Sequence, residues 1–231
     1  MLLFSLECSA AAASAAIYWD EKLLGEEFLN VPQTHSVTLL PMAKSLLEHT
    51  GISPAQIDYY AVSRGPGSFT GLRIGIAAIK GLAFPDNTPC IGVSTPEAIA
   101  YGLLGFEGTV IPMMDARCGQ VYTALFQGKD GRLTRLSEDE ALPLSELKEK
   151  LKSCTGPLWL CGDGAHLGLA AWGEELPVRM APAHLCCQRA SAVGLAAMRH
   201  LGEAVSPAAL VPCYLRPANA MTLAERQHKA E

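Results

Sequence analysis

The residues best suited to chemistry lie in a glycine-rich stretch, residues 63–75, which follows a strand-forming run and precedes a helix-forming run. Its glycines, which permit positive φ angles and the close approach of another backbone, are Gly65, Gly67 and Gly71. Ser68 or Thr70 can cap the following helix by accepting a hydrogen bond from a free amide. Such a turn suits an anion, because free N–H groups and the positive end of the helix dipole point the same way. It equally suits another segment of backbone, and the sequence leaves both interpretations open.

Acidic residues at strand ends form a second group of candidates. Glu7 ends an apolar strand and is followed by Ser9, and Asp115 has the same position after a later strand. Actin-like ATPases hold phosphate and Mg²⁺ with a strand-end acid and nearby hydroxyl groups. These residues, together with a second glycine turn at Gly162 and Gly164, are therefore a candidate nucleotide site. For Glu7, the other interpretation is a solvated hairpin tip.

Metal chemistry, and with it a metallopeptidase activity, has little support. A two-histidine metal site on a helix needs histidines about four residues apart, but at that spacing from His35 the sequence has Leu39. None of the eight cysteines forms the C-x-x-C pair that zinc sites commonly use. No Ser-His-Asp or Cys-His arrangement is recognisable at the level of motifs. We therefore expect neither a metal ligand set nor a catalytic residue.

The composition is that of a globular protein with an acidic excess. Of its 231 residues, 49% are hydrophobic and 18% are charged, and the formal net charge is −5. A negative net charge argues against broad electrostatic binding of nucleic acid by the chain alone. The first residues lack the basic segment of a signal peptide. No apolar run reaches the length of about 20 residues that spans a bilayer. We therefore expect a cytoplasmic protein with reduced cysteines and no membrane contact.

The order of apolar and polar runs predicts an α/β protein with an internal repeat. A β-meander is expected at residues 2–29, and the same order of strand, acid, strand, turn and strand returns at residues 109–136. Helices are expected after each meander. We place a first domain at residues 1–106, a second at 107–218 and a polar tail at 219–231.

Two predicted helices of the first domain have features of contact surfaces. The helix expected at residues 35–50 is apolar on more than one side, which indicates either deep burial or an interface shared with a partner. Pro41 is expected to delay its start or to bend it. The helix at residues 72–84 carries Gly75 and Ala78 near one side. Glycine inside a helix costs about 0.5–1 kcal/mol relative to alanine, so we expect a close neighbour, from the same chain or another.

Several stretches, taken together, resemble the TsaB family, also called YeaZ. They are residues 63–75, His35-Ser36 with residues 39–42, residues 115–117 with Val121-Tyr122, and residues 212–216. They follow the family's order across nearly the whole chain. The resemblance implies two related actin-like domains of the ASKHA, RNase H-like class, with mixed sheets flanked by helices.

The resemblance also implies a function in tRNA modification. In this family the protein is a non-catalytic scaffold that binds TsaD, its catalytic paralogue, and acts with the ATPase TsaE. The complex transfers a threonylcarbamoyl group from threonylcarbamoyl-AMP to the adenosine beside the anticodon, which gives t6A in tRNAs that read codons beginning with A. We therefore expect tRNA to be reached only through the complex. We also expect a homodimer when the chain is alone, and no cofactor in the isolated chain.

We predict that the partner interface combines the first helix with the glycine-rich stretch and the helix after it. Its residues are His35, Leu39, Leu40, Met42, Ala43, Leu46, Gly67, Thr70, Gly71, Ile74, Gly75 and Ala78. The sequence departs from the family at residues 7–9, where Glu-Cys-Ser replaces the usual Asp-Thr-Ser, and this change argues against an ATP–Mg²⁺ site. The alternative is an autonomous actin-like nucleotide-binding kinase or ATPase, whose site residues would be Glu7, Ser9, Asp115, Gly162 and Gly164.

Overall fold

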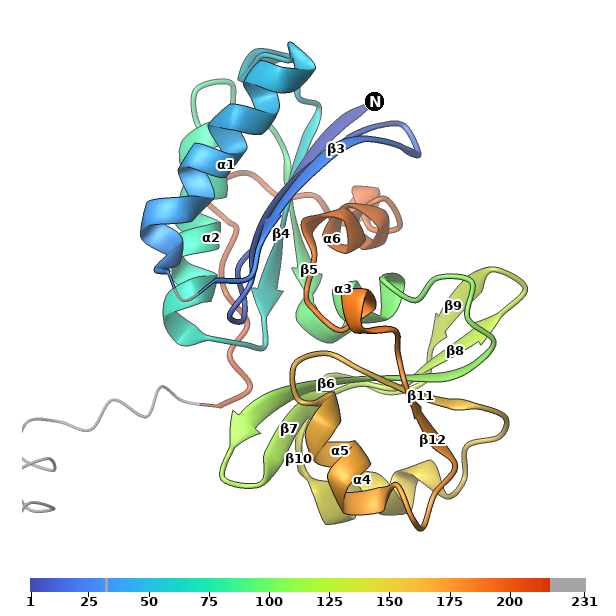
Figure 1. Ribbon diagram of the computed structural model, residues 1–231. Helices are drawn as coiled ribbons and strands as arrows, with labels where there is room; N and C mark the ends of the chain where they lie inside the picture. The colour runs from blue at the N-terminus through green and yellow to red at the C-terminus, as the bar shows by residue number, and fades with distance from the viewer. Residues whose placement is uncertain (32, 217–231) are drawn as a thin grey trace, which may run out of the picture.

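The computed structural model describes residues 1–31 and 33–216 and arranges them around two β-sheets (Figure 1). The predicted polar tail at 219–231 lies outside the described residues. The first sheet has five strands in the order β3-β2-β1-β4-β5. They are β1 (Leu2–Glu7), β2 (Ala13–Trp19), β3 (Lys22–Leu29), β4 (Tyr59–Gly65) and β5 (Cys90–Ser94). The meander β1-β2-β3 is antiparallel, whereas β4 and β5 run parallel to β1.

The second sheet has seven strands built around one long central strand, β6. Its strands are β6 (Gly108–Arg117), β7 (Gln120–Thr123), β8 (Phe126–Lys129), β9 (Arg132–Arg135), β10 (Glu140–Pro143), β11 (Leu158–Cys161) and β12 (Val178–Met180). The main order is β10-β7-β6-β11-β12, and β8 joins β6 to β9. Strand, acid, strand, turn and strand therefore occur twice, and the mixed sheets confirm the predicted α/β class.

Helices form layers on the sheets. They are α1 (His35–Thr50), α2 (Phe69–Ala83), α3 (Thr95–Tyr101), α4 (Leu144–Leu151), α5 (Ala165–Trp172) and α6 (Ala190–Ala197), with 3₁₀ turns at Pro54–Gln56, Ala183–Leu185 and Leu201–Glu203. α1 and α2 share a core with one face of the first sheet, and α3 and α6 cover the other face. α4 and α5 cover the second sheet. α3 lies between the sheets. Its Ala98 belongs to the core that α3 and α6 form with the first sheet, and its Ile99 belongs to a core of the second sheet.

The end of the described chain returns to the first sheet. Val193 and Ala196 of α6 are fully buried against β1, β2 and α3. Farther on, the Val205 N–H donates to Cys90 O at 2.9 Å and so extends the pairing of β5. The domain boundary after residue 106 stays a prediction. The core between the first sheet, α3 and α6 contains segments from both sides of that boundary.

Local signals set the ends of the two long helices. α1 ends at Gly51, which has a φ of 67° and caps the helix in the left-handed conformation. The expected late start of α1 is wrong: the helix begins at His35 and contains Pro41. Proline removes only one amide donor there, and packing of the buried side of α1 on the sheet maintains the rest. α2 begins after Ser68, whose Oγ accepts a hydrogen bond from Gly71 N at 3.2 Å.

One predicted strand is divided in two. The return strand expected at residues 120–127 is interrupted between β7 and β8, where the backbone of Leu125 bonds to a different segment. Leu125 N donates to Ser137 Oγ at 3.0 Å, and Leu136 N donates to Leu125 O at 2.7 Å.

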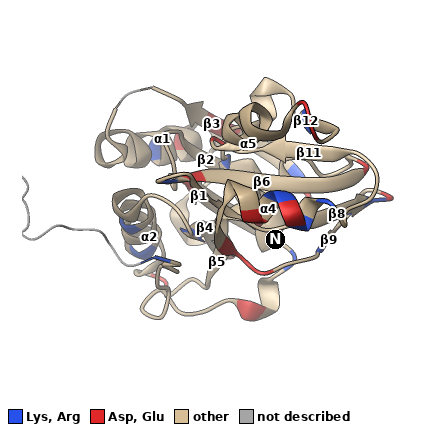
Figure 2. Cartoon of the chain, turned by 90° about the horizontal axis from the view of Figure 1, so that it is seen from below, with Lys and Arg blue, Asp and Glu red and all other residues tan. Residues whose placement is uncertain are grey.

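Charged residues of both signs are spread over the chain, while α2 carries only basic ones (Figure 2). Within residues 1–31 and 33–216, no helix has the length and apolar character needed to cross a membrane.

Candidate functional site

The Glu7 carboxyl group, the first candidate ligand for a nucleotide-bound metal, points into the protein. It is fully buried at the end of β1. Its Oε1 accepts a hydrogen bond from Ser9 N at 2.5 Å, and its Oε2 accepts one from the Ser63 hydroxyl. Burial raises the pKa of this carboxyl group, against the opposing effect of those hydrogen bonds. Both oxygens are thus already used by the chain's own donors.

The glycine-rich turn packs against the first hairpin of the same chain. The Ser68 N–H donates to Ser9 O at 2.7 Å. A Cβ at Gly71 would lie 2.1 Å from Cys8 O, and a Cβ at Gly75 would lie 2.8 Å from Cys8 Sγ. The sequence left open whether this stretch contacts an anion or another backbone. The structure shows the backbone contact, and the contacting segment is the β1–β2 hairpin.

The second acidic hairpin lies opposite the first. Asp115 Oδ1 accepts a hydrogen bond from Arg117 N at 2.8 Å, and its other oxygen pairs with the Arg117 guanidinium at 3.2 Å. Gly164 N donates to Met113 O at 2.9 Å, and a Cβ at Gly162 would lie 2.3 Å from the same oxygen. These glycines therefore allow the end of β11 to press against β6.

A small cavity separates the two hairpins. Its volume is ≈ 220 Å³, and its lining includes Ser9, Gly67, Asp115 and Asp163. Ser9 Oγ is buried and has no hydrogen-bond partner among the described residues. Asp163 Oδ1 accepts a hydrogen bond from Gln188 Nε2 at 2.8 Å. The structure therefore brings Ser9 and Asp115 together, while Glu7, Gly162 and Gly164 do not line the space.

This cavity suits a nucleotide poorly. Small-molecule sites usually have volumes of about 300–1,000 Å³. Within residues 1–31 and 33–216, no three side chains of His, Cys, Asp or Glu gather in a way that could hold a metal ion. His35 is the histidine whose partner, four residues later, is missing from the two-histidine metal pattern. Its Nε2 lies 2.7 Å from Ala10 O, so the ring contacts the β1–β2 hairpin.

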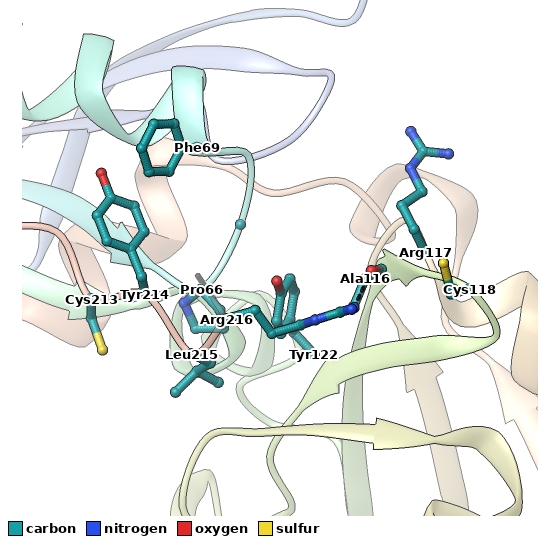
Figure 3. A pocket seen from close by; sticks show the side chains of 11 residues that line it. Pro66, Phe69, Ala116, Arg117, Cys118, Tyr122, Cys213, Tyr214, Leu215 and Arg216 are labelled. Atoms are coloured by element: carbon teal, nitrogen blue, oxygen red, sulfur yellow. Dashed lines mark hydrogen bonds between the residues drawn. The ribbon is translucent and has the colours of Figure 1, made fainter. Parts of the chain in front are cut away.

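Sequence reasoning missed how residues 206–216, here called the C-terminal strap, connect the two sheets. The strap runs along α2, where Arg73 Nε donates to the Tyr214 hydroxyl at 3.1 Å. Its last described residue, Arg216, donates through Nη1 to Ala116 O of β6 at 2.9 Å (Figure 3). Residues 212–216 matched a family motif, but their types do not indicate which strand they reach.

Aromatic and basic side chains surround a pocket of ≈ 200 Å³ beside the strap (Figure 3). Phe69 and Tyr214 lie with ring centroids 4.8 Å apart, and the Arg73 guanidinium lies 3.8 Å from the centre of the Phe69 ring. These contacts occupy the aromatic faces with the chain's own groups. The pocket therefore marks the junction of the turn, the strap and the β6–β7 hairpin.

A larger groove lies on the outer side of the first sheet, along α1. Its volume is ≈ 940 Å³. Its apolar lining includes Leu47, Ile52 and Leu82. Lys44 and Glu48 of α1 also line it, and their charged groups pair at 3.7 Å. Leu40 lies at the groove with 51% of its surface exposed. An apolar centre with a polar rim is typical of protein–protein interfaces.

The predicted partner interface divides into buried and accessible residues. The buried ones are Leu39, Met42, Ala43, Leu46, Gly71, Gly75 and Ala78. They pack within the chain, and the small-residue side of α2 has a close neighbour in Cys8, while contact of these residues with a partner stays a prediction. The accessible ones are Leu40 and Thr70, which are exposed, and His35, Gly67 and Ile74, which are partly buried. Their contact with a partner stays a prediction.

Comparison with known proteins connects this arrangement to a family. The model of the TsaD family, described as tRNA N6-adenosine threonylcarbamoyltransferase, matches residues 29–154. The tRNA threonylcarbamoyladenosine biosynthesis protein TsaB of Bacillus subtilis is 30% identical over 220 residues, which cover 95% of this chain and 96% of that protein. The chain belongs to the TsaB family. Escherichia coli TsaB is 34% identical over 167 residues, 71% of this chain and 72% of that protein.

Solved structures agree with membership of the TsaB family and confirm the resemblance seen in the sequence. A Pseudomonas aeruginosa protein described as similar to peptidase YeaZ has a TM-score of 0.80 at 28% identity, covering 93% of this chain and 99% of that chain. The activator of the 2-hydroxyisocaproyl-CoA dehydratase from Clostridium difficile has a TM-score of 0.50 at 12% identity, covering 88% and 96%. At that identity the likeness concerns the fold alone, and it confirms the predicted actin-like class.

Proposed function

We propose that this chain is a non-catalytic, cytoplasmic subunit of the machinery that makes threonylcarbamoyladenosine in tRNA. It binds TsaD directly, supports the ATPase TsaE, and reaches tRNA only through the complex. Membership of the TsaB family, whose curated members are named for this biosynthesis, supports the assignment. The threonylcarbamoyl group is transferred to the adenosine beside the anticodon of tRNAs that read codons beginning with A.

The observation that carries the proposal is the groove along α1. Its apolar lining is open to solvent, and Leu40 extends that apolar surface onto the outer side of the helix. Val37, one turn earlier, is 65% exposed. A helix of a partner that lies along α1 would cover both side chains and remove their apolar area from water. TsaD is the occupant in the complex, and a second copy of this chain takes the same place when TsaD is absent.

Three features support a non-catalytic role without a cofactor in the isolated chain. Both Glu7 oxygens are used by Ser9 and Ser63. The volume of the cavity between the hairpins, ≈ 220 Å³, lies below the range of about 300–1,000 Å³ for small-molecule sites. His35 contacts the Ala10 carbonyl group. Catalysis is therefore assigned to TsaD, and the contribution of this chain is binding.

The test uses Leu40→Asp, with Leu136→Asp as the matched control. Leu136 is 52% exposed, close to the 51% of Leu40, and does not line the groove. Each variant is mixed with TsaD from the same organism, and binding is measured by calorimetry. A central apolar interface residue typically contributes about 2 kcal/mol or more. We therefore expect Leu40→Asp to weaken binding by at least about 30-fold, and Leu136→Asp to leave it unchanged.

A second measurement tests the role in the reaction. tRNA modification is reconstituted with TsaD, TsaE and threonylcarbamoyl-AMP, with and without this chain. We expect modification to require the chain and to fall with Leu40→Asp. Binding of Leu40→Asp equal to that of the control would show that the groove is not the interface. Transfer by this chain in the absence of TsaD would refute the non-catalytic role.

A further inference from the structure

In Figure 1, α3, α6 and the β8–β9 hairpin lie on the side of the molecule away from α1 and α2. Two adjoining cavities lie there, one lined by residues of α3, of α6 and of the β2–β3 turn, the other by residues of α3, of the β8–β9 hairpin and of the segment after α6. Their volumes are ≈ 470 Å³ and ≈ 420 Å³. Tyr101, Leu104 and Arg199 line both of them. Each volume lies within the range of small-molecule sites, about 300–1,000 Å³.

Two arginine residues line the second of these cavities. Arg132 comes from the start of β9 and Arg199 from the segment after α6. Neither forms an ion pair within the described part of the chain, whereas Arg135 and Arg189 both pair with carboxylates. Both side chains are exposed, and two positive groups that line one cavity favour an anion there, because its oxygens can accept hydrogen bonds from both.

We propose that this pair of cavities binds a small molecule that carries a phosphate or carboxylate group on a partly apolar body. The anionic group lies between Arg132 and Arg199, because the planar guanidinium forms paired hydrogen bonds to such oxygens. The apolar part lies against Leu104, which both cavities share. The first cavity is also lined by Asp20 and Glu21, which repel an anion. The ligand therefore binds in one orientation, with its charge toward β9.

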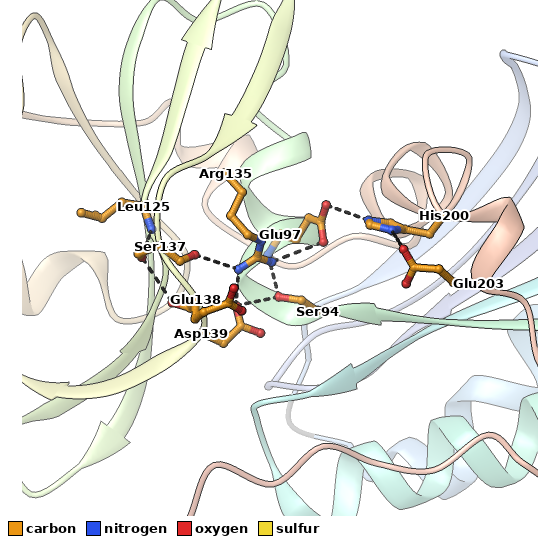
Figure 4. A network of polar contacts seen from close by, with 9 residues as sticks. All are labelled: Ser94, Glu97, Leu125, Arg135, Ser137, Glu138, Asp139, His200 and Glu203. Carbon is orange, nitrogen blue, oxygen red and sulfur yellow. Dashed lines mark hydrogen bonds and ion pairs between the residues drawn. The ribbon is translucent and has the colours of Figure 1, made fainter.

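The site joins segments that a polar network already holds together (Figure 4). Arg135, on the same strand as Arg132, pairs with Glu97 at the start of α3 at 3.3 Å. His200, next to Arg199, lies with Nε2 2.9 Å from the same Glu97 carboxylate. A ligand that contacts Arg132 and Arg199 thus bridges the second sheet and the helices of the first. Its binding stabilises the arrangement of the two sheets and raises the melting temperature.

The test is calorimetric titration of the full chain with two probes, inorganic pyrophosphate and citrate, at fixed ionic strength. The variants are Arg132→Gln and Arg199→Gln. The charge-matched control is Arg64→Gln, because Arg64 is exposed, lines neither cavity and forms no ion pair within residues 1–31 and 33–216. A hydrogen bond to a charged group typically contributes about 1.5–3 kcal/mol. Each cavity variant should therefore bind at least about tenfold more weakly, while Arg64→Gln binds as the unaltered chain does.

Each outcome decides one point. Saturable binding of pyrophosphate alone assigns a phosphate ligand, and binding of citrate alone assigns a carboxylate ligand. Absence of saturable binding of both probes at millimolar concentration overturns the proposal. An equal loss in Arg64→Gln also overturns it, because the attraction would then be a property of overall charge. Thermal unfolding of each variant without probe verifies that the fold is intact. The groove proposed to bind TsaD lies on another face of the molecule. The result of the anion-binding test therefore does not depend on the result of the TsaD-binding test.

Discussion

Replacement of Gly75 with alanine tests whether the small-residue side of α2 packs on the chain's own first sheet. The new Cβ would lie 2.8 Å from Cys8 Sγ and 3.2 Å from Val62 Cγ2. Cys8 is buried and its thiol donates to Gly71 O at 3.2 Å, so it cannot move aside without losing this contact.

The size of the effect follows from two opposing contributions. Overpacking of a well-filled core costs about 1–3 kcal/mol. Alanine in place of glycine inside a helix returns about 0.5–1 kcal/mol. We therefore expect Gly75→Ala to lower the free energy of unfolding by up to about 2.5 kcal/mol. Gly81 is the control in the same helix: nothing lies within 4 Å of its Cβ position, so Gly81→Ala should stabilise the protein by about 0.5–1 kcal/mol.

A double-mutant cycle with Cys8→Ala identifies the atom responsible. Alanine at position 8 removes the sulfur that Gly75→Ala would crowd, so the double variant should recover stability, with a coupling of about 1 kcal/mol. Urea denaturation, followed by circular dichroism, measures the four proteins of the cycle and Gly81→Ala. If Gly75→Ala is as stable as Gly81→Ala, the close packing of this side of α2 is refuted.

Two further predictions concern pH. Burial lowers the pKa of His200, but hydrogen bonds from its ring to Glu97 and Glu203 outweigh this and raise the pKa above 6.5. The resulting stabilisation is complete below pH 6.5 and is lost as the pH rises through the folded-state pKa. His200→Gln should therefore flatten the dependence of melting temperature on pH in this range, and an unchanged slope would contradict the assignment. Glu7 is the opposite case: burial raises its pKa above 4.5, so stability falls as the pH rises from 4.5 to the folded-state value. Glu7→Gln, which still accepts the Ser63 hydrogen bond, should increase the free energy of unfolding more at neutral pH than at acidic pH. Equal effects of Glu7→Gln at both pH values would refute the buried-carboxyl argument.

The parts of the fold that sequence reasoning predicted depend on local chemistry. The left-handed cap at Gly51 and the Ser68 cap of α2 follow from residue type and position. The repeated meander follows from alternating apolar runs. Pro41 was interpreted by the same local rules, and there packing on the sheet outweighed the loss of one amide donor.

The candidate site was harder to predict, because contacts between distant segments decide it. The spacing of Gly71 and Gly75 shows that something approaches α2 but does not say what, and Cys8 is more than 60 residues away in the chain. The direction of the Glu7 side chain depends on Ser63, 56 residues later. The strap contact of Arg216 with Ala116 spans 100 residues. Family motifs identified these segments but not their neighbours.

The return of α6 to the first sheet also affects how the protein can be made. Ser14 Oγ accepts a hydrogen bond from Ala190 N at 2.7 Å, and Ser5 Oγ donates to Ala190 O at 2.7 Å. During translation, the part of this face where α6 packs on β1 and β2 lacks that cover until residues 190–197 leave the ribosome, whereas α3 is made much earlier. A gene fragment that stops after residue 106 keeps α3 but lacks α6, so it would leave apolar side chains of β1 and β2 exposed to water.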